Sequence, residues 1–267
     1  MKDKIYQALL AFTVIGLVFS PYLTSLSLIG LVILAAFHWR DFQRRQSFGL
    51  WFILLFFNIL FLVGTDPVIP YWIGRLRVHL PFLLLPIAFL FLPTLSAKQQ
   101  LNFHLFFAFV LLVGCAHSMV LYYGEIDIYQ ERIKMGQSIP VPTRSHIRFN
   151  MMLVYALLNL GWFGWNRPQL LNKKWKKVAV ILSIILLFIS IHWLSVRSGL
   201  LTLYSMLALI IIRHIWRSKL WKWGFGGLIF LIGMPVLSYF SLPSFKAKVG
   251  YTVYEFEMIL KGLGFRV

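Results

Sequence analysis

The residues best suited to chemistry in this chain are arginines at the edges of long apolar segments. Arg197 lies in the sequence Ser195-Val196-Arg197-Ser198-Gly199, near the middle of the apolar run of residues 178–212. The other arginines at such edges are Arg75, Arg77, Arg144 and Arg148. A guanidinium presents a planar fork of donors that matches phosphate or carboxylate oxygens, whereas a lysine offers only a point charge. This use of arginine favours recognition of an anionic group.

The apolar run of residues 178–212 is too long for one membrane crossing. As a single helix it would reach roughly 50 Å at about 1.5 Å per residue, while the hydrocarbon core is about 30 Å thick. The run is therefore expected to fold back, and Ser198-Gly199 is its only polar and flexible place. A guanidinium in lipid costs at least about 2.5 kcal/mol. We thus expect Arg197 at a membrane face or in a wet cavity.

His146 and Arg148 stand where a polar segment enters the next apolar segment. One interpretation is an imidazole beside an anion-binding arginine, able to take a proton from a hydroxyl. The alternative is that His146 packs at an interface while Arg148 and Arg197 extend to lipid headgroups. Arg75 and Arg77 precede Leu80-Pro81, where a predicted helix start would add its positive field for an anion. Interfacial anchoring is the alternative for this pair too.

The composition predicts an all-α polytopic membrane protein. Of the 267 residues, 60% are hydrophobic, and the chain has 26 Lys and Arg residues but only 8 Asp and Glu residues. The basic residues cluster between apolar segments, which is typical of orientation signals and lipid contacts rather than nucleic-acid binding. Lipid forbids unpaired backbone, so each apolar segment is predicted to be a helix. We predict nine spans: 6–19, 25–37, 48–64, 80–92, 101–122, 148–165, 178–194, 198–212 and 223–240.

The distribution of Lys and Arg predicts the orientation. Dense clusters at 40–45, 173–177 and 213–222 lie in short connectors, so these connectors are expected on the cytoplasmic side. The N-terminus is then cytoplasmic and the C-terminus periplasmic. Residues 1–240 form the predicted transmembrane domain, with outer loops at 65–79 and 123–147. Residues 241–267 begin a periplasmic loop.

Several motifs are missing from the sequence. It has no Gly-rich phosphate loop after a strand, no His-Glu-x-x-His pair and no Gly-x-Ser-x-Gly nucleophile turn. Cys115 is the single cysteine, which excludes an internal disulfide. We therefore expect neither a bound metal nor a cofactor.

Four stretches resemble the bacterial O-antigen ligase and polymerase family. They are Trp193-Leu194-Ser195-Val196-Arg197-Ser198-Gly199-Leu200-Leu201, Gly74-Arg75-Leu76-Arg77-Val78-His79-Leu80-Pro81, His146-Ile147-Arg148-Phe149-Asn150 and Phe245-Lys246-Ala247-Lys248-Val249-Gly250-Tyr251-Thr252. The resemblance implies a metal-independent glycosyltransferase of the bacterial inner membrane. It would transfer or polymerise a glycan from an undecaprenyl-diphosphate carrier to an acceptor glycan or lipid on the periplasmic face.

The resemblance also implies the roles of single residues. Arg197 matches the family arginine at the Arg-Ser-Gly turn, and Arg75, Arg77 and Arg148 would help to hold the diphosphate. The chain departs from the family after residue 267, before the periplasmic region that carries the catalytic histidine, so it is expected to be truncated. The truncated chain is then expected to lack the transfer base and to be inactive by itself, and the catalytic residue stays unassigned. His146 is a candidate base, but it does not simply take the place of the distal histidine. The alternatives are a secondary carrier for an anionic amphiphile and a non-catalytic membrane scaffold.

Overall fold

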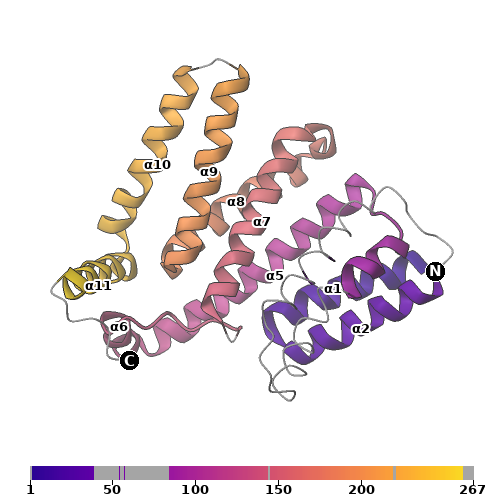
Figure 1. Ribbon diagram of the computed structural model, residues 1–267, viewed down its shortest axis with the longest axis horizontal. Coiled ribbons are helices and arrows are strands. Elements are labelled where there is room, and N and C mark those ends of the chain that lie inside the picture. Colours follow the sequence, from indigo (N-terminus) through magenta and orange to yellow (C-terminus); the bar gives the residue numbers. More distant parts are fainter. Residues whose placement is uncertain are drawn as a thin grey trace. The chain divides into compact units, whose positions relative to one another are not determined.

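The computed structural model describes residues 2–38, 54, 57, 84–143, 145–218 and 221–260. Within these residues the regular structure is entirely helical, which confirms the predicted all-α class. The chain divides into two compact units, residues 1–100 and residues 101–267. Each unit is described by itself, with the helix labels of Figure 1.

The first unit contains a tight helical hairpin. Helix α1 (Lys2–Phe19) and helix α2 (Pro21–Phe37) are separated by Ser20 alone. Ser20 is the N-cap of α2, where its hydroxyl accepts a hydrogen bond from the Leu23 backbone N–H at 3.3 Å. Pro21 follows at the first helical position, where its missing N–H costs nothing. This confirms the predicted pair of short helices joined at Pro21. Residues 84–91 are also helical.

The second unit is built from seven α-helices and one 3₁₀ turn within the described residues. They are α5 (Ala97–Gly124), α6 (Ile126–Lys134), α7 (His146–Asn166), η2 (Pro168–Leu171), α8 (Lys174–Leu194), α9 (Arg197–Ser218), α10 (Trp221–Ser241) and α11 (Pro243–Leu260). Helix α7 packs against both α8 and α9, and α9 lies beside α10 (Figure 1). The buried core of this unit includes Phe149, Leu153 and Leu160 of α7 with Leu187 and Ile191 of α8.

Fewer helices are long and apolar enough to cross a membrane than the nine spans that we predicted. Among the described residues, α5 and α8 meet this description, and a bent pair within α10 and α11 would add a third. The described residues therefore include two to three helices able to span a membrane by length and composition. The predicted segment 48–64 lies almost entirely outside the described residues, and the predicted orientation stays a prediction.

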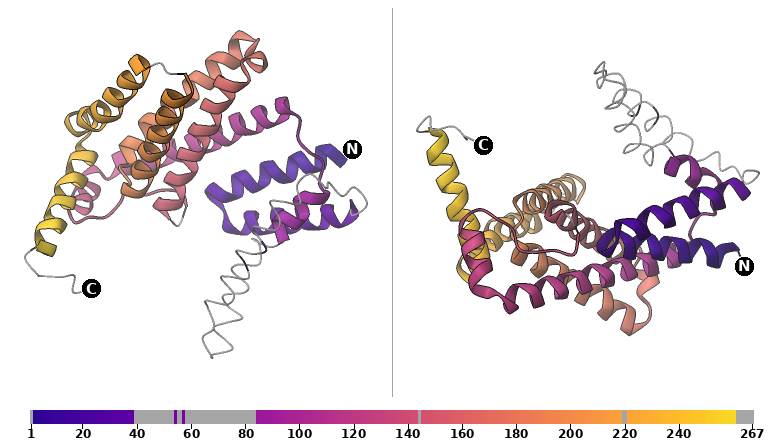
Figure 2. Two further views of the ribbon diagram at one scale, coloured as in Figure 1. Left: turned by 45° about the horizontal axis from the view of Figure 1, so that its top comes forward. Right: turned by 90° about the horizontal axis from the view of Figure 1, so that it is seen from below.

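Two helices lie where the sequence analysis predicted loops. Helix α6 occupies part of the expected outer loop 123–147, and α11 occupies most of the segment 241–260. Both segments were predicted as loops because they carry several charged residues. These are Asp127, Glu131 and Arg132 in α6, and Lys246 and Lys248 in α11. Helix α11 leaves the line of α10 at a bend of 104° (Figure 2).

The break in the long apolar run lies three residues before the predicted Ser198-Gly199. Helix α8 ends at Leu194, and its C-cap Ser195 adopts a left-handed backbone with φ of 51°. Ser198 and Gly199 are instead in the first turn of α9. The run does break into two helices as expected. The position differs because Ser195 can adopt the left-handed conformation while its hydroxyl bonds the backbone nearby.

Candidate functional site

Distant segments of the second unit meet at one end of its helices. We name this region the loop end: it comprises α6, residues 135–146, the break between α8 and α9, and the first turns of α11. Helix α11 contacts α6, α8 and α10, and α7 contacts α9. The rings of Tyr122, at the end of α5, and Trp193, at the end of α8, meet edge to face at 5.6 Å. The loop end therefore collects residues from several helices of the unit.

The first turns of α7 and α9 approach closely at Gly199. A Cβ atom on this glycine would lie 1.9 Å from the Asn150 Oδ1 atom, so only a glycine fits beside the amide. Asn150 is fully buried, and neither its amide oxygen nor its nitrogen has a hydrogen-bond partner among the described residues. The neighbouring Ser198 hydroxyl is also buried without a partner there. Glycine at position 199 thus holds the start of α9 against α7.

Hydrogen bonds connect the α8–α9 break to α11. The Ser195 hydroxyl donates to the His192 carbonyl at 2.6 Å, and the Ser244 hydroxyl donates to the Trp193 carbonyl at 2.8 Å. These bonds satisfy two of the carbonyls that the end of α8 leaves without helical partners. Phe245 stacks on the His192 ring with the ring centroids 6.5 Å apart. The start of α11 is therefore attached to the break by both polar and ring contacts.

His192 has partners for both ring nitrogens. One nitrogen, Nδ1, lies 2.8 Å from the Phe188 carbonyl and must donate to it, because a carbonyl only accepts. The Tyr204 hydroxyl lies 2.6 Å from Nε2 and donates to it in the neutral tautomer. This buried histidine joins α8 to α9 and serves the fold rather than a ligand.

Arg197 occupies the first position of α9 and faces α11. Its guanidinium carbon lies 5.4 Å from the centroid of the Tyr251 ring, a cation–π geometry. The same tyrosine leaves no space for a side chain at position 136, because a Cβ atom on Gly136 would lie 2.5 Å from the Tyr251 Cζ atom. Lys248, one turn earlier on α11, donates from Nζ to the Gly136 carbonyl. Two cations and one tyrosine thus join the start of α9, α11 and the segment after α6.

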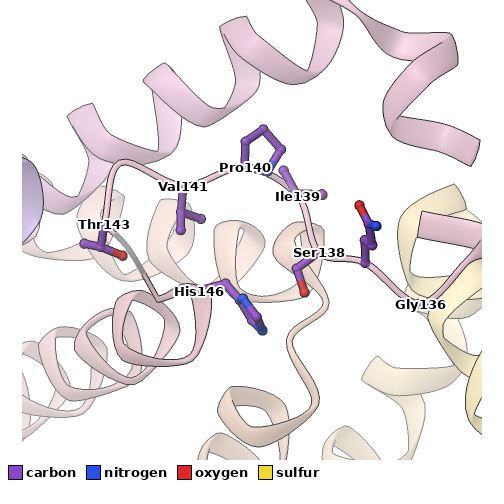
Figure 3. Close-up of a pocket in the computed structure, with 8 residues that line it drawn as sticks. Gly136, Ser138, Ile139, Pro140, Val141, Thr143 and His146 are labelled. Atoms are coloured by element: carbon purple, nitrogen blue, oxygen red, sulfur yellow. The ribbon is translucent and has the colours of Figure 1, made fainter. Parts of the chain in front are cut away.

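A pocket of about 420 Å³ lies between residues 136–143 and the start of α7. His146 and Ser138 point toward one another across it (Figure 3). Burial lowers the pKa of the His146 imidazole, and the positive charge of Lys248 lowers it further. An imidazole with a lowered pKa is neutral at pH 7, so it can accept one hydrogen bond and donate another.

The structure brings together some of the predicted site residues. Arg197 and His146 both lie at the loop end, and they are linked through Lys248 and Tyr251 of α11. Arg148 lies in the first turn of α7 with its side chain exposed, and its backbone N–H bonds the Ser145 N-cap hydroxyl. The exposed side chain of Arg148 agrees with anion binding and equally with the alternative that it extends to lipid headgroups. The predicted residues Arg75, Arg77 and Arg144 lie outside the described residues.

Other residues of the site were not singled out in the sequence. Lys248 and Tyr251 belong to a stretch that was noticed only for its resemblance, and Asn150 follows Arg148 in another. Ser138 and Pro140 lie in a segment that was predicted as a plain outer loop. A signal was present in Ser138-Ile139-Pro140-Val141-Pro142, since two prolines one residue apart keep a segment out of helices.

Across the described residues, no group of three or more His, Cys, Asp or Glu side chains is arranged to hold a metal ion. The cations and the neutral imidazole of the loop end instead suit an anion and hydroxyl groups. No family model, curated protein or solved structure matches this chain.

Proposed function

We propose that this chain is a membrane protein that binds a glycan carried on a polyprenyl diphosphate at its loop end. The carrier would be undecaprenyl diphosphate, and the activity would be transfer or polymerisation of the glycan, as in the O-antigen ligase and polymerase family. The loop end would face the periplasm of a bacterial inner membrane. The nine predicted spans, with the N-terminus cytoplasmic, belong to this proposal.

The observation that carries the proposal is the convergence of the stretches that resemble the family. Residues 146–150, 193–201 and 245–252 are far apart in sequence, yet they meet at the loop end. Asn150 lies against Gly199, and Arg197 lies over the Tyr251 ring. The fourth stretch, residues 74–81, lies outside the described residues. Convergence supports a shared role for these segments, because separate lipid anchors need no mutual contact.

The chemistry of the loop end suits a diphosphate. Arg197 is at the N-terminus of the 22-residue helix α9, where the positive end of the helix dipole favours an anion. Lys246 and Lys248 of α11 add positive charge nearby. When a glycan leaves its carrier, the diphosphate keeps the electron pair of the broken bond. Positive groups placed around that anion stabilise it as a leaving group.

The opposite end of the unit supports the proposed orientation. Lys173, Lys174 and Lys177 are exposed where η2 meets α8, with Trp175 exposed among them. Clustered lysines in a short connector, with an interfacial tryptophan, are typical of the cytoplasmic side of a membrane protein.

The test is direct binding of undecaprenyl diphosphate to the purified chain in lipid nanodiscs. We expect binding that weakens as salt rises, because the contact is charge-assisted at a partly wet face. Arg197→Lys keeps the charge but loses the fork, so the affinity should fall about tenfold, the value of one good charge-assisted hydrogen bond. The matched control is Arg213→Lys, an exposed arginine about 24 Å further along the same helix, which should bind as the wild type does.

The outcomes separate the candidate functions. Equal weakening by Arg197→Lys and Arg213→Lys would favour general attraction to headgroups, and absence of binding at low salt would refute the proposal. Transfer of a glycan from the carrier to an added acceptor would establish the enzyme activity. Binding without transfer would favour a carrier or a scaffold.

A further inference from the structure

The pocket beside His146 has a wall of unusual backbone. Residues 137–143 form no regular element. Ile139 and Val141 each precede a proline, which biases both toward an extended conformation, and the prolines have no N–H to donate. Extended segments of this kind carry no internal hydrogen bonds. The sequence thus explains why the wall presents its peptide groups instead of pairing them.

These peptide groups are open to a ligand. Among the described residues, the backbone N–H and carbonyl groups of residues 138–143 make no hydrogen bond with the protein. The Ser138 hydroxyl likewise has no protein partner there. The wall is nevertheless fixed in place, because Ile139 is buried and Lys248 bonds the Gly136 carbonyl. A fixed wall with unpaired donors and acceptors can bind a ligand that supplies both.

The side chains of the pocket indicate the class of that ligand. The described lining residues carry no formal charge when His146 is neutral, and their polar groups are hydroxyl, amide and imidazole. Pro140 and Val141 add small apolar surfaces beside them. The volume of about 420 Å³ falls in the range of roughly 300–1,000 Å³ that is usual for small-molecule sites. A sugar fits this mixture, because its hydroxyls donate and accept while its C–H faces pack on apolar groups.

We propose that this pocket binds an uncharged sugar unit, with a hydroxyl group between Ser138 and His146. The inference rests on the proposed function, in which Arg197 and its neighbours bind the anionic carrier. It adds a second and chemically different subsite, for a neutral ligand. The two subsites share the loop end, since Lys248 supports the pocket wall and lies one turn from Tyr251, which Arg197 covers.

The test uses the purified full chain in nanodiscs on a glycan array that carries neutral and acidic bacterial oligosaccharides. We expect binding to a subset of the neutral oligosaccharides. Ser138→Ala and His146→Phe should each weaken it about tenfold, the effect of losing one ligand hydrogen bond. Ser138→Ala leaves the fold intact, because this hydroxyl bonds nothing in the described protein. The control Ser205→Ala removes an exposed hydroxyl of α9 and should have no effect.

A second measurement reports on the wall itself. Backbone amides without partners exchange their hydrogens quickly, so the strongest neutral oligosaccharide should slow the exchange of residues 138–143. Undiminished binding in both pocket variants, a preference for acidic oligosaccharides, or no binding at all would overturn the proposal. The assay contains no lipid carrier, so it reports binding of the oligosaccharide alone. A failure here is therefore distinguishable from a failure of the proposed carrier binding.

Discussion

The two ends of the second unit are both basic, but they are built differently. At the loop end, Lys248 bonds a carbonyl 112 residues away, and Arg197 lies over a tyrosine of another helix. We name the opposite end the lysine end; it comprises Asn102, Arg167, η2 and residues 173–177. There, Lys173, Lys174 and Lys177 are exposed on one short connector. Lys176 is the buried exception there, and it donates to the Asn102 side-chain oxygen at 3.2 Å.

The comparison shows that positive charge alone does not mark a binding site. Exposed lysines on one connector suit loose contact with headgroups, because each side chain acts separately. A site needs groups from several elements in fixed relation. In the part of the chain that the structure describes, the loop end combines buried polar contacts between distant segments with a pocket beside them. The following predictions compare the two ends, beginning with the largest effect.

Gly199→Ala should disrupt the loop end most. The new Cβ would overlap the buried Asn150 amide, and overpacking of this kind costs about 1–3 kcal/mol of unfolding free energy. Thermal unfolding in nanodiscs would measure the loss. The control is Gly161→Ala in the other half of α7, where a Cβ meets nothing within 4 Å. That change should stabilise the helix by roughly 0.5–1 kcal/mol.

A double variant checks the cause of the Gly199→Ala effect. Asn150→Ala removes the overlapping amide, so the pair Asn150→Ala and Gly199→Ala should recover most of the lost stability. If the double variant were as unstable as Gly199→Ala alone, the close approach of α7 and α9 would not be the reason.

Gly136→Ala should have the next largest effect. Gly136 has a φ of 85°, a left-handed conformation that costs an alanine about 1–2 kcal/mol, and the Tyr251 ring occupies the space of the new Cβ. The loss should appear as a lower melting temperature and as weaker binding of the neutral oligosaccharide. Gly250→Ala is the control, because it is exposed on α11 with open space around it and should be neutral or stabilising. Equal behaviour of the two variants would contradict the proposed link between the pocket wall and α11.

Lys176→Met should have a small effect at the lysine end. The variant loses one hydrogen bond to Asn102, but Asn102 is exposed and can bond water, so we expect a change within about 1 kcal/mol. Lys174→Met, at an exposed neighbour, should change stability by less than about 0.5 kcal/mol. Both variants should keep the wild-type affinity for undecaprenyl diphosphate. A large loss of affinity in either would move the carrier site away from the loop end.

Lys248→Met should change the titration of His146. Burial is the larger cause of the lowered pKa of His146, and the positive charge of Lys248 is the smaller cause. Removing the lysine should therefore raise the pKa of His146 while leaving it below about 6.5. Because the folded-state pKa is lowered, the free energy of unfolding should fall as the pH drops below about 6.5. Lys248→Met should reduce that fall. Histidine ring NMR would follow both effects, with Lys246→Met, exposed on the same helix, as the variant expected to show neither.

The apolar segments could be predicted well from the sequence, and the charged helices could not. Helices α1, α2, α5 and α7 to α10 match predicted segments, because lipid-like runs leave the backbone no alternative to a helix. Helices α6 and α11 carry charges and no long apolar run, so they were predicted as loops. They are stabilised by the packing of α11 against α6, α8 and α10, which composition does not reveal.

The candidate site was predicted only in part, for a similar reason. Residue type indicated Arg197 and His146, since an arginine beside lipid and a histidine at a segment edge stand out locally. The roles of Asn150, Lys248 and Ser138 depend on neighbours that are distant in sequence. Two prolines predict an extended segment at 138–142, but not that His146 at the start of α7 lines a pocket with it.

The bond from Lys248 to Gly136 also has a consequence for biosynthesis. In a chain made from its N-terminus, α5, α6 and α7 are synthesised before α11, and the pocket wall then has no support from α11. Contacts that span so many residues form late, after the local helices. The pocket is therefore completed only when the last described helix docks. A ribosome that stalls before residue 248 would leave the pocket wall without the bond from Lys248 to Gly136.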